Sequence, residues 1–259
     1  MFKLSKVIET KADQIEIVAF GDIHLGNPNC KFNKFKEIVN YIKNTPNCYG
    51  IGMGDYIECI LPKDKRFDPH TDIEVSDPVV SEYIDIIVKT LEPIKDKILC
   101  LLTGNHEYHI HSDGYCEPTK EICRRLFGSE KGVYGGFSAF LKLKVKPKTH
   151  RPSLVFFLHH GWCAGRKTGS VVNNVEGLSQ YWDADVYLVG HSHKLWATRQ
   201  VKIGWGGQRK VIFGNTGTFL ETCSWGKTSY SERAAYPPLK LGVLKIKYYP
   251  KRGDIHVSE

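Results

Sequence analysis

The sequence lacks the features of membrane-spanning and exported proteins. Its longest apolar runs, such as residues 154–158, are far shorter than the roughly 20 residues that cross a bilayer as a helix. Residues 1–19 alternate charged and apolar side chains, whereas a secretory leader has a basic segment, an apolar block and a cleavage site. We therefore expect a cytoplasmic protein that does not bind a membrane.

The eight cysteines lack the spacing of a metal or redox motif, because no Cys-x-x-Cys pair occurs. Cys100 lies in an apolar run, where a free thiol behaves as a small hydrophobic side chain. A disulfide framework is not expected in a chain of 259 residues with scattered cysteines. We interpret the cysteines as reduced thiols and expect no cysteine-based zinc site.

The charge is unbalanced, since lysine and arginine exceed aspartate and glutamate by 36 − 28 = 8. Such an excess favours anionic partners such as nucleic acid. Much of it lies in dispersed runs: Lys142, Lys144, Lys146, Lys148, Lys245, Lys247, Lys251 and Arg252. Lysines of this kind also keep sheet edges solvated. The charge therefore leaves nucleic-acid binding and simple solvation both open.

A repeated unit dominates the sequence: an apolar, strand-like run that ends in a short polar cluster. The runs are residues 15–20, 49–53, 98–102, 154–158 and 186–189. The clusters that follow read Gly-Asp-Ile-His, Gly-Asp, Gly-Asn-His-Glu, His-His-Gly and Gly-His-Ser-His. Helical periodicity over residues 34–43 and 79–92 separates the first three runs. Strand, helix, strand is the order of a parallel sheet, whose ligands bind at the carboxyl ends of the strands.

The second half of the chain has a different pattern. Strands are predicted at residues 138–145, 196–203, 210–213 and 241–248, with a Gly-Trp-Gly-Gly turn at residues 204–207. We interpret this half as antiparallel and expect a second sheet stacked on the first, with helices outside. The chain of 259 residues fits one α/β domain, residues 1–259.

The polar clusters offer the side chains of a two-metal site. Asp22 and His24 are two residues apart on what we expect to be extended backbone, so that both can bind one ion. His191 and His193 repeat this spacing, and Asp55 suits a carboxylate that bridges two ions. The cage is completed by an amide oxygen and an imidazole, from Asn105 and His160. Oxygen and nitrogen ligands without thiolate favour Mn, with Fe, Zn, Co or Ni as alternatives, over Ca or a soft metal.

The order of these motifs, over residues 21–193, resembles the calcineurin-like metallophosphoesterase superfamily. The resemblance implies a four-layer αββα sandwich of two stacked mixed sheets, with two divalent metal ions at the carboxyl ends of the strands. The implied ligands of one ion are Asp22, His24 and His193. Those of the other ion are Asn105, His160 and His191, with Asp55 bridging. His160 is the implied ligand rather than His159 because the superfamily's histidine directly precedes glycine.

The resemblance also implies a catalytic mechanism. A hydroxide that bridges the two ions attacks the phosphorus. His106 is the implied catalytic residue, which stabilises the phosphorane or protonates the leaving oxygen. Glu107 either orients His106 or caps the following turn. No Ser-His-Asp triad or phosphate-binding Gly-x-x-x-x-Gly-Lys motif offers a competing mechanism.

The substrate class is less clear in the sequence. The protein phosphatases of the superfamily carry two arginines that clamp a phosphomonoester, and the matching stretches here, Gly-Asp-Tyr-Ile-Glu-Cys and Leu-Leu-Thr-Gly-Asn-His, have none. Gly-Asp-Ile-His-Leu-Gly is similar to the DNA-repair exonuclease branch and to small exonuclease-like phosphoesterases of phages and prokaryotes. We therefore expect a phosphodiesterase acting on nucleic acid or nucleotides. The alternatives are a phosphomonoesterase on a small molecule or phosphoprotein, and a non-catalytic nucleic-acid-binding module.

Two insertions, at about residues 59–77 and 162–174, follow metal-bearing strand ends, and we expect them to set specificity. The candidate phosphate-binding residues there are Arg66, Arg166, Lys167 and Asn173. Phe67 or Trp162 can stack on a base. The C-terminal aromatic residues are expected to fill the core or a homodimer contact, with a stacking platform as the alternative: Trp205, Phe219, Trp225, Tyr230 and Tyr236.

Overall fold

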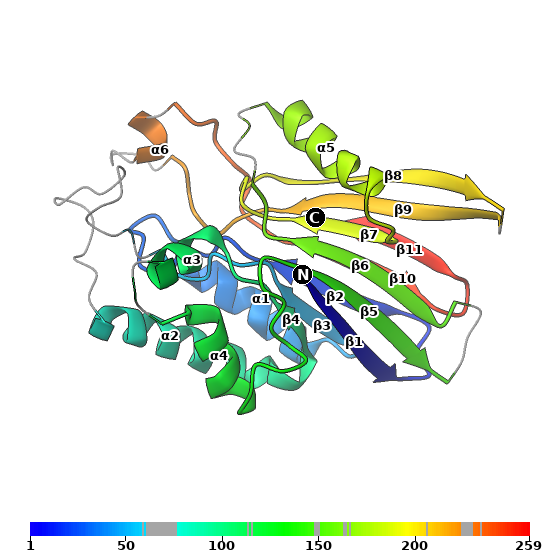
Figure 1. Cartoon of the computed structure of the whole chain (residues 1–259), viewed down its shortest axis with the longest axis horizontal. Coiled ribbons are helices and arrows are strands. Elements are labelled where there is room, and N and C mark those ends of the chain that lie inside the picture. Colours follow the sequence, from blue (N-terminus) through cyan, green and yellow to red (C-terminus); the bar gives the residue numbers. More distant parts are fainter. Residues whose placement is uncertain are drawn as a thin grey trace.

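A computed structural model of the chain describes residues 1–58, 60, 77–112, 114, 116–147, 151–162, 165, 167–205, 207–223, 230–233 and 235–259. Its core consists of two stacked β-sheets (Figure 1). The five-stranded sheet has the order β11 (Asp254–Ser258), β10 (Leu244–Tyr249), β2 (Ile15–Phe20), β3 (Cys48–Gly52) and β4 (Ile98–Leu101). The six-stranded sheet has the order β1 (Phe2–Glu9), β5 (Ser138–Lys146), β6 (Ser153–His159), β7 (Val186–Val189), β9 (Gly207–Thr216) and β8 (Leu195–Gly204).

Helices cover the outer face of each sheet. The five-stranded sheet is covered by α1 (Phe32–Asn44), α2 (Asp77–Leu91), α3 (Asn105–Ser112) and α4 (Pro118–Phe127), whose apolar side chains share one cluster with its strands. The six-stranded sheet is covered by α5 (Thr168–Gly177). The short elements are η1 (Glu92–Lys97), η2 (Leu178–Gln180) and α6 (Tyr230–Arg233). The predicted αββα sandwich is therefore confirmed. None of the described helices has the length and apolar character that a membrane crossing requires.

Strand β2 shows why the sandwich forms. All six of its residues are buried, because alternate side chains face the two apolar layers on either side of the sheet. Ile17 packs between the two sheets, and Phe20 packs under the helices. Cys100 on β4 also packs between the sheets, as a small hydrophobic side chain.

Two features differ from the prediction, and a third, the division of the cluster-bearing strands between the sheets, was not predicted. The second half is mixed rather than antiparallel, because β7 runs parallel to both β6 and β9. The five strands that carry polar clusters are divided between the sheets, with β2, β3 and β4 in one and β6 and β7 in the other. Much of the predicted insertion at residues 162–174 is helical, since α5 begins at Thr168 and buries Val171 and Val175 one turn apart.

Candidate metal centre

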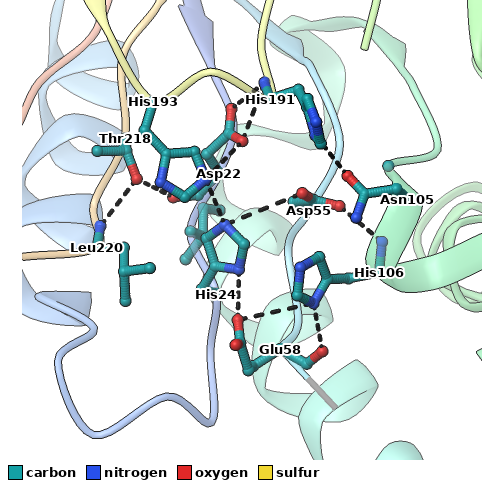
Figure 2. A network of polar contacts seen from close by, with 12 residues as sticks. Asp22, His24, Asp55, Glu58, Asn105, His106, His191, His193, Thr218 and Leu220 are labelled. Atoms are coloured by element: carbon teal, nitrogen blue, oxygen red, sulfur yellow. Dashed lines mark hydrogen bonds and ion pairs between the residues drawn. The ribbon is translucent and has the colours of Figure 1, made fainter. Parts of the chain in front are cut away.

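The loops after β2, β3, β4, β6 and β7 converge at the carboxyl ends of these strands. Backbone hydrogen bonds tie these loops together: the Asp22 N–H donates to the Gly54 carbonyl (2.9 Å), and the Gly190 N–H donates to the His160 carbonyl (2.8 Å). The second of these bonds joins neighbouring loops of the six-stranded sheet, and the first joins neighbouring loops of the five-stranded sheet. The structure thus brings all seven predicted metal ligands into one region, several of which are drawn in Figure 2.

Five predicted ligands have left-handed backbone conformations, with φ between 49° and 63°. They are Asp22, His24, Asp55, His191 and His193. In the described part of the chain only Asn47 and Ala235 are further non-glycine residues with positive φ. This conformation is uncommon for residues with a Cβ and concentrates at functional sites. The expectation of extended backbone at Asp22 and His24 was therefore wrong: turns, rather than the pleat of a strand, make their side chains converge.

The first donor group contains Asp22, His24 and His193. The Nε2 atoms of His24 and His193 are 3.0 Å apart, and His193 Nε2 is 3.3 Å from Asp22 Oδ1. The backbone N–H of His191 donates to both carboxylate oxygens of Asp22, at 3.1 Å each. That bond holds the Asp22 carboxylate in place and links this group to the neighbouring one.

The second donor group is centred on Asn105 Oδ1, which lies 2.7 Å from His191 Nδ1 and 3.0 Å from His160 Nε2. Asp55 Oδ2 is 3.3 Å from His160 Nε2 and 3.9 Å from His24 Nε2. Asp55 therefore lies between the two groups. His159 is in neither group. Its ring packs edge-on against Trp162, with 4.9 Å between the ring centroids.

These donors fit divalent metal ions. The carbonyl of Met53 accepts from His160 Nδ1 at 2.8 Å, so a neutral His160 directs the lone pair of Nε2 toward two further acceptors, Asn105 Oδ1 and Asp55 Oδ2. Burial lowers the pKa of His160, but the Asp55 and Asp22 carboxylates outweigh it and raise that pKa to about 10. Positive charge is thus strongly favoured at this point. A cation with nitrogen and oxygen ligands satisfies the same lone pairs.

Two glycines permit this close approach of the loops. A Cβ on Gly104 would lie 2.1 Å from Asp55 Oδ1, and a Cβ on Gly54 would lie 2.8 Å from His160 Nδ1. Gly54 also has a φ of 95°, a conformation that other residues rarely adopt. The glycines that precede Asp55 and Asn105 in the sequence are therefore steric requirements of the site.

His106 lies beside the first donor group. Its Nδ1 donates to the Glu58 carbonyl (2.7 Å), and its backbone N–H donates to Asp55 Oδ1 (2.9 Å). The ring meets the His24 ring edge-on, with centroids 4.7 Å apart (Figure 2). Because a carbonyl can only accept, this contact places a hydrogen on Nδ1.

Glu58 is a buried residue of the site that the sequence analysis did not select. Its carboxylate pairs with His24 Nδ1, lies 3.7 Å from His106 Nδ1 and accepts from Asn27 Nδ2 (3.2 Å). Burial raises the pKa of Glu58, but the neighbouring His106 and His24 outweigh it and lower that pKa to about 2. The available signal was an acidic residue three positions after Asp55, and nothing in the sequence shows that this side chain turns inward.

Glu107 binds backbone N–H groups, but those of the preceding Gly104 and of the loop after β3 rather than those of the turn that follows it. Its carboxylate accepts the backbone N–H groups of Gly104 (2.8 Å), Asp55 (2.9 Å) and Tyr56 (2.6 Å). It is fully buried, and burial together with the Asp55 charge raises its pKa to about 7. Glu107 thus fixes the loop that carries Asp55 against the loop that carries Asn105.

The predicted substrate-binding residues are only partly within the described chain. Lys167 is exposed just before α5, and Asn173 is exposed on α5. Arg66, Phe67 and Arg166 lie outside the described residues, as do most of the predicted insertion at residues 59–77 and Trp225. Phe219 is buried in the core beneath α1, whereas Trp205 is fully exposed in the turn between β8 and β9. The aromatic residues of the C-terminal part therefore do not form one group.

A family model, calcineurin-like phosphoesterase, matches residues 15–195 of this chain. The match covers more than half of the 259 residues, and the chain belongs to this family. Together with the two donor groups, this identifies a metallophosphoesterase, a metal-dependent hydrolase of phosphoester bonds.

Comparison with curated proteins found no match. Among solved structures, the chain is similar to a predicted phosphoesterase from Streptococcus pneumoniae, with 12% identity, a TM-score of 0.36 and coverage of 90% of this chain and 83% of that one. It is similar to a metallophosphoesterase from Sphaerobacter thermophilus, with 11% identity, a TM-score of 0.38 and coverage of 95% and 89%. It is also similar to Vps29 complexed with Zn²⁺ from Entamoeba histolytica, with 11% identity, a TM-score of 0.37 and coverage of 94% and 97%.

Proposed function

We propose that this metallophosphoesterase hydrolyses phosphodiesters of nucleic acids or nucleotides. The observation that carries the proposal is the absence of the arginine clamp from its two expected positions. Thr103 stands just before Gly-Asn-His, and its hydroxyl donates to Glu117 Oε1 (2.9 Å). The stretch after Gly-Asp reads Tyr-Ile-Glu-Cys, without arginine, and its Glu58 pairs with His24. With no clamp for the doubly charged end of a monoester at these positions, a singly charged diester fits the site better.

The two donor groups would hold one divalent ion each. Asp22, His24 and His193 would bind the first ion. Asn105, His160 and His191 would bind the second, and Asp55 would bridge them. Bound ions supply an activated water at neutral pH and offset negative charge on the phosphate. Manganese is the proposed metal, with Fe, Zn, Co and Ni as alternatives, because the donors are nitrogen and oxygen.

His106 would protonate the leaving-group oxygen. The Glu58 carbonyl holds Nδ1, so the imidazole can carry its transferable proton on Nε2. The Asp55 carboxylate fixes the backbone of the same residue through the His106 N–H. The ring is thus oriented by the loop that also supplies the bridging carboxylate.

A parallel assay of four substrates tests the proposal. Purified protein loaded with Mn²⁺ is given bis-p-nitrophenyl phosphate, p-nitrophenyl phosphate, single-stranded DNA and RNA, with a chelator as the control for metal dependence. We expect hydrolysis of bis-p-nitrophenyl phosphate and of at least one nucleic acid. Hydrolysis of the monoester alone would instead establish the alternative, a phosphomonoesterase.

A further inference from the structure

Two exposed aromatic side chains, Tyr108 and Phe137, pack against each other at the surface. Tyr108 lies on α3, and Phe137 directly precedes β5. Their ring centroids are 5.2 Å apart with an interplanar angle of 71°, which is an edge-to-face contact. The exposed fractions of the two residues are 48% and 39%, so that both rings stay accessible to a ligand.

Helix α3 places Tyr108 beside Asn105, the residue on which the second donor group is centred. The two residues are three positions apart on the helix, so that their Cβ atoms lie about 5–6 Å apart on one face. The Tyr108 N–H donates to the Gly104 carbonyl (3.1 Å), which fixes the first turn of the helix. Asn105 and His191 are partly exposed, whereas His160 is buried. The second group is therefore open to solvent on the side of Asn105.

Backbone hydrogen bonds attach Phe137 to two of the loops that supply the second donor group. The Phe137 carbonyl accepts the N–H of His160 (2.9 Å), one of the predicted ligands. The carbonyl of the preceding Gly136 accepts the N–H of Thr103 (2.9 Å), which is two residues before Asn105. The two rings thus adjoin the second donor group through separate elements, one through α3 and the other through the segment before β5.

Packing of the core does not account for these two rings. None of the apolar clusters in the described part of the chain contains Tyr108 or Phe137. Exposed aromatic rings provide flat surfaces on which another ring can stack. Every nucleobase has such a ring face, and single-stranded nucleic acids bind to aromatic side chains in this way.

We propose that Tyr108 and Phe137 form the stacking surface for an unpaired nucleobase next to the scissile phosphodiester. The proposal rests on the phosphodiesterase function proposed above. A base in a duplex is already stacked and paired, so this binding mode selects single strands or nucleotides over duplex nucleic acid. Stacking tolerates any of the bases, and the surface therefore distinguishes a base from no base rather than one sequence from another.

A kinetic comparison tests the stacking role. Two single-stranded oligonucleotides differ only at one central bond, where the second carries abasic sugars on both sides. The wild type should cleave that bond with a kcat/KM about tenfold higher in the base-bearing oligonucleotide, the scale of one stacked base. Tyr108→Leu and Phe137→Leu should each remove most of this preference, whereas Tyr108→Phe should keep it because the ring remains.

Two controls separate stacking from support of the metal centre. Tyr181→Leu, at an exposed tyrosine that lies before β7 begins, is the matched variant and should keep the full preference. The metal content of Tyr108→Leu and Phe137→Leu should equal that of the wild type. An equal loss of rate on both oligonucleotides in these two variants would overturn the inference, because the rings would then support the centre rather than the base.

A binding experiment separates this inference from the proposed function, because it needs no hydrolysis. Protein labelled with 3-fluorotyrosine and loaded with Zn²⁺ is mixed with deoxyadenosine or deoxyribose, and the fluorine signals are followed by NMR. Deoxyadenosine should shift the signal that Tyr108→Phe deletes, and deoxyribose should not. Diester hydrolysis without a base preference or such a shift would overturn this inference alone. A base-dependent shift without diester hydrolysis would overturn the proposed function alone.

Discussion

The two donor groups of the metal centre are supported in different ways. In the first group, a buried side-chain carboxylate, Glu58, orients His24 and lies near His106. In the second group, a backbone atom orients the histidine, because the Met53 carbonyl accepts from His160 Nδ1. The loop after His160 leads to Trp162 and α5. Under the proposed function, the first side, which holds His106, would support proton transfer.

The largest effect is expected where the two groups meet. Asp55→Asn should reduce hydrolysis below detection, because Asp55 lies between the groups and also holds the backbone of His106. Bound metal should fall from two ions per chain, which elemental analysis of the purified variant measures. Asp183→Asn, at an exposed carboxylate paired with Arg209, is the control. Full activity of Asp55→Asn would show that the two groups do not share a bridging ligand.

Substitution of His106 should separate catalysis from metal binding. His106→Ala should lower kcat by about 100- to 10,000-fold, the usual range for a general acid or base. The metal content should stay at the wild-type value, whereas His191→Ala should lose metal from the second group. Equal loss of metal in both variants would contradict the separate role of His106. If His106→Ala hydrolyses a diester with a good leaving group, such as p-nitrophenol, at the wild-type rate, the result would support proton donation by His106.

Glu58→Gln should weaken the first group and spare the second. Removing a carboxylate that orients a ligating histidine costs about 10- to 100-fold in metal affinity. Titration of the metal-free protein should therefore show one weakened site and one unchanged site. Glu117→Gln, at a partly buried carboxylate that caps α4, is a matched control. Two equally weakened sites would show that Glu58 supports the whole loop and not His24 in particular.

The smallest effect is expected far from both groups, at the ion pair between Asp254 on β11 and Lys210 on β9. The hydrogen bond from Lys210 lowers the pKa of Asp254 to about 2. The stabilisation is therefore present above the unfolded pKa of about 3.9 and is lost as the pH falls toward 2. Since the pair is partly exposed, Asp254→Asn should cost less than about 1 kcal/mol in the free energy of unfolding at pH 7. Urea unfolding at pH 7 and pH 2.5 measures this difference, which should shrink at the lower pH.

The predictable part of the fold was the part with local periodicity. Strands β2 and β7 occupy the residues expected, and α1 and α2 begin and end within two residues of the prediction. Strand β1 and helix α5 were missed. In β1 the half-buried Lys6 lies between the buried Leu4 and Ile8 on one face, so no continuous apolar face marks the strand in the sequence. α5 is short and contains two glycines and two asparagines, which are typical of loops.

At the candidate site too, the sequence predicted only what local patterns show. Each predicted ligand follows an apolar strand, so sequence position alone predicted which side chains meet at one edge. Glu58 carries no such signal, because its burial depends on strands and loops that are distant in the sequence. Arg66 and Arg166, which lie outside the described residues, stay predictions.

By itself, the sequence determined the sandwich, the family and the set of residue types that can bind two metal ions. These follow from local information: apolar runs long enough for strands, glycines where Cβ atoms would clash, and polar residues at strand ends. Only the tertiary structure decided how the donors divide into two groups and which carboxylate orients His24. Those relations depend on loops from two different sheets packing together, and this long-range packing leaves no short-range pattern in the chain.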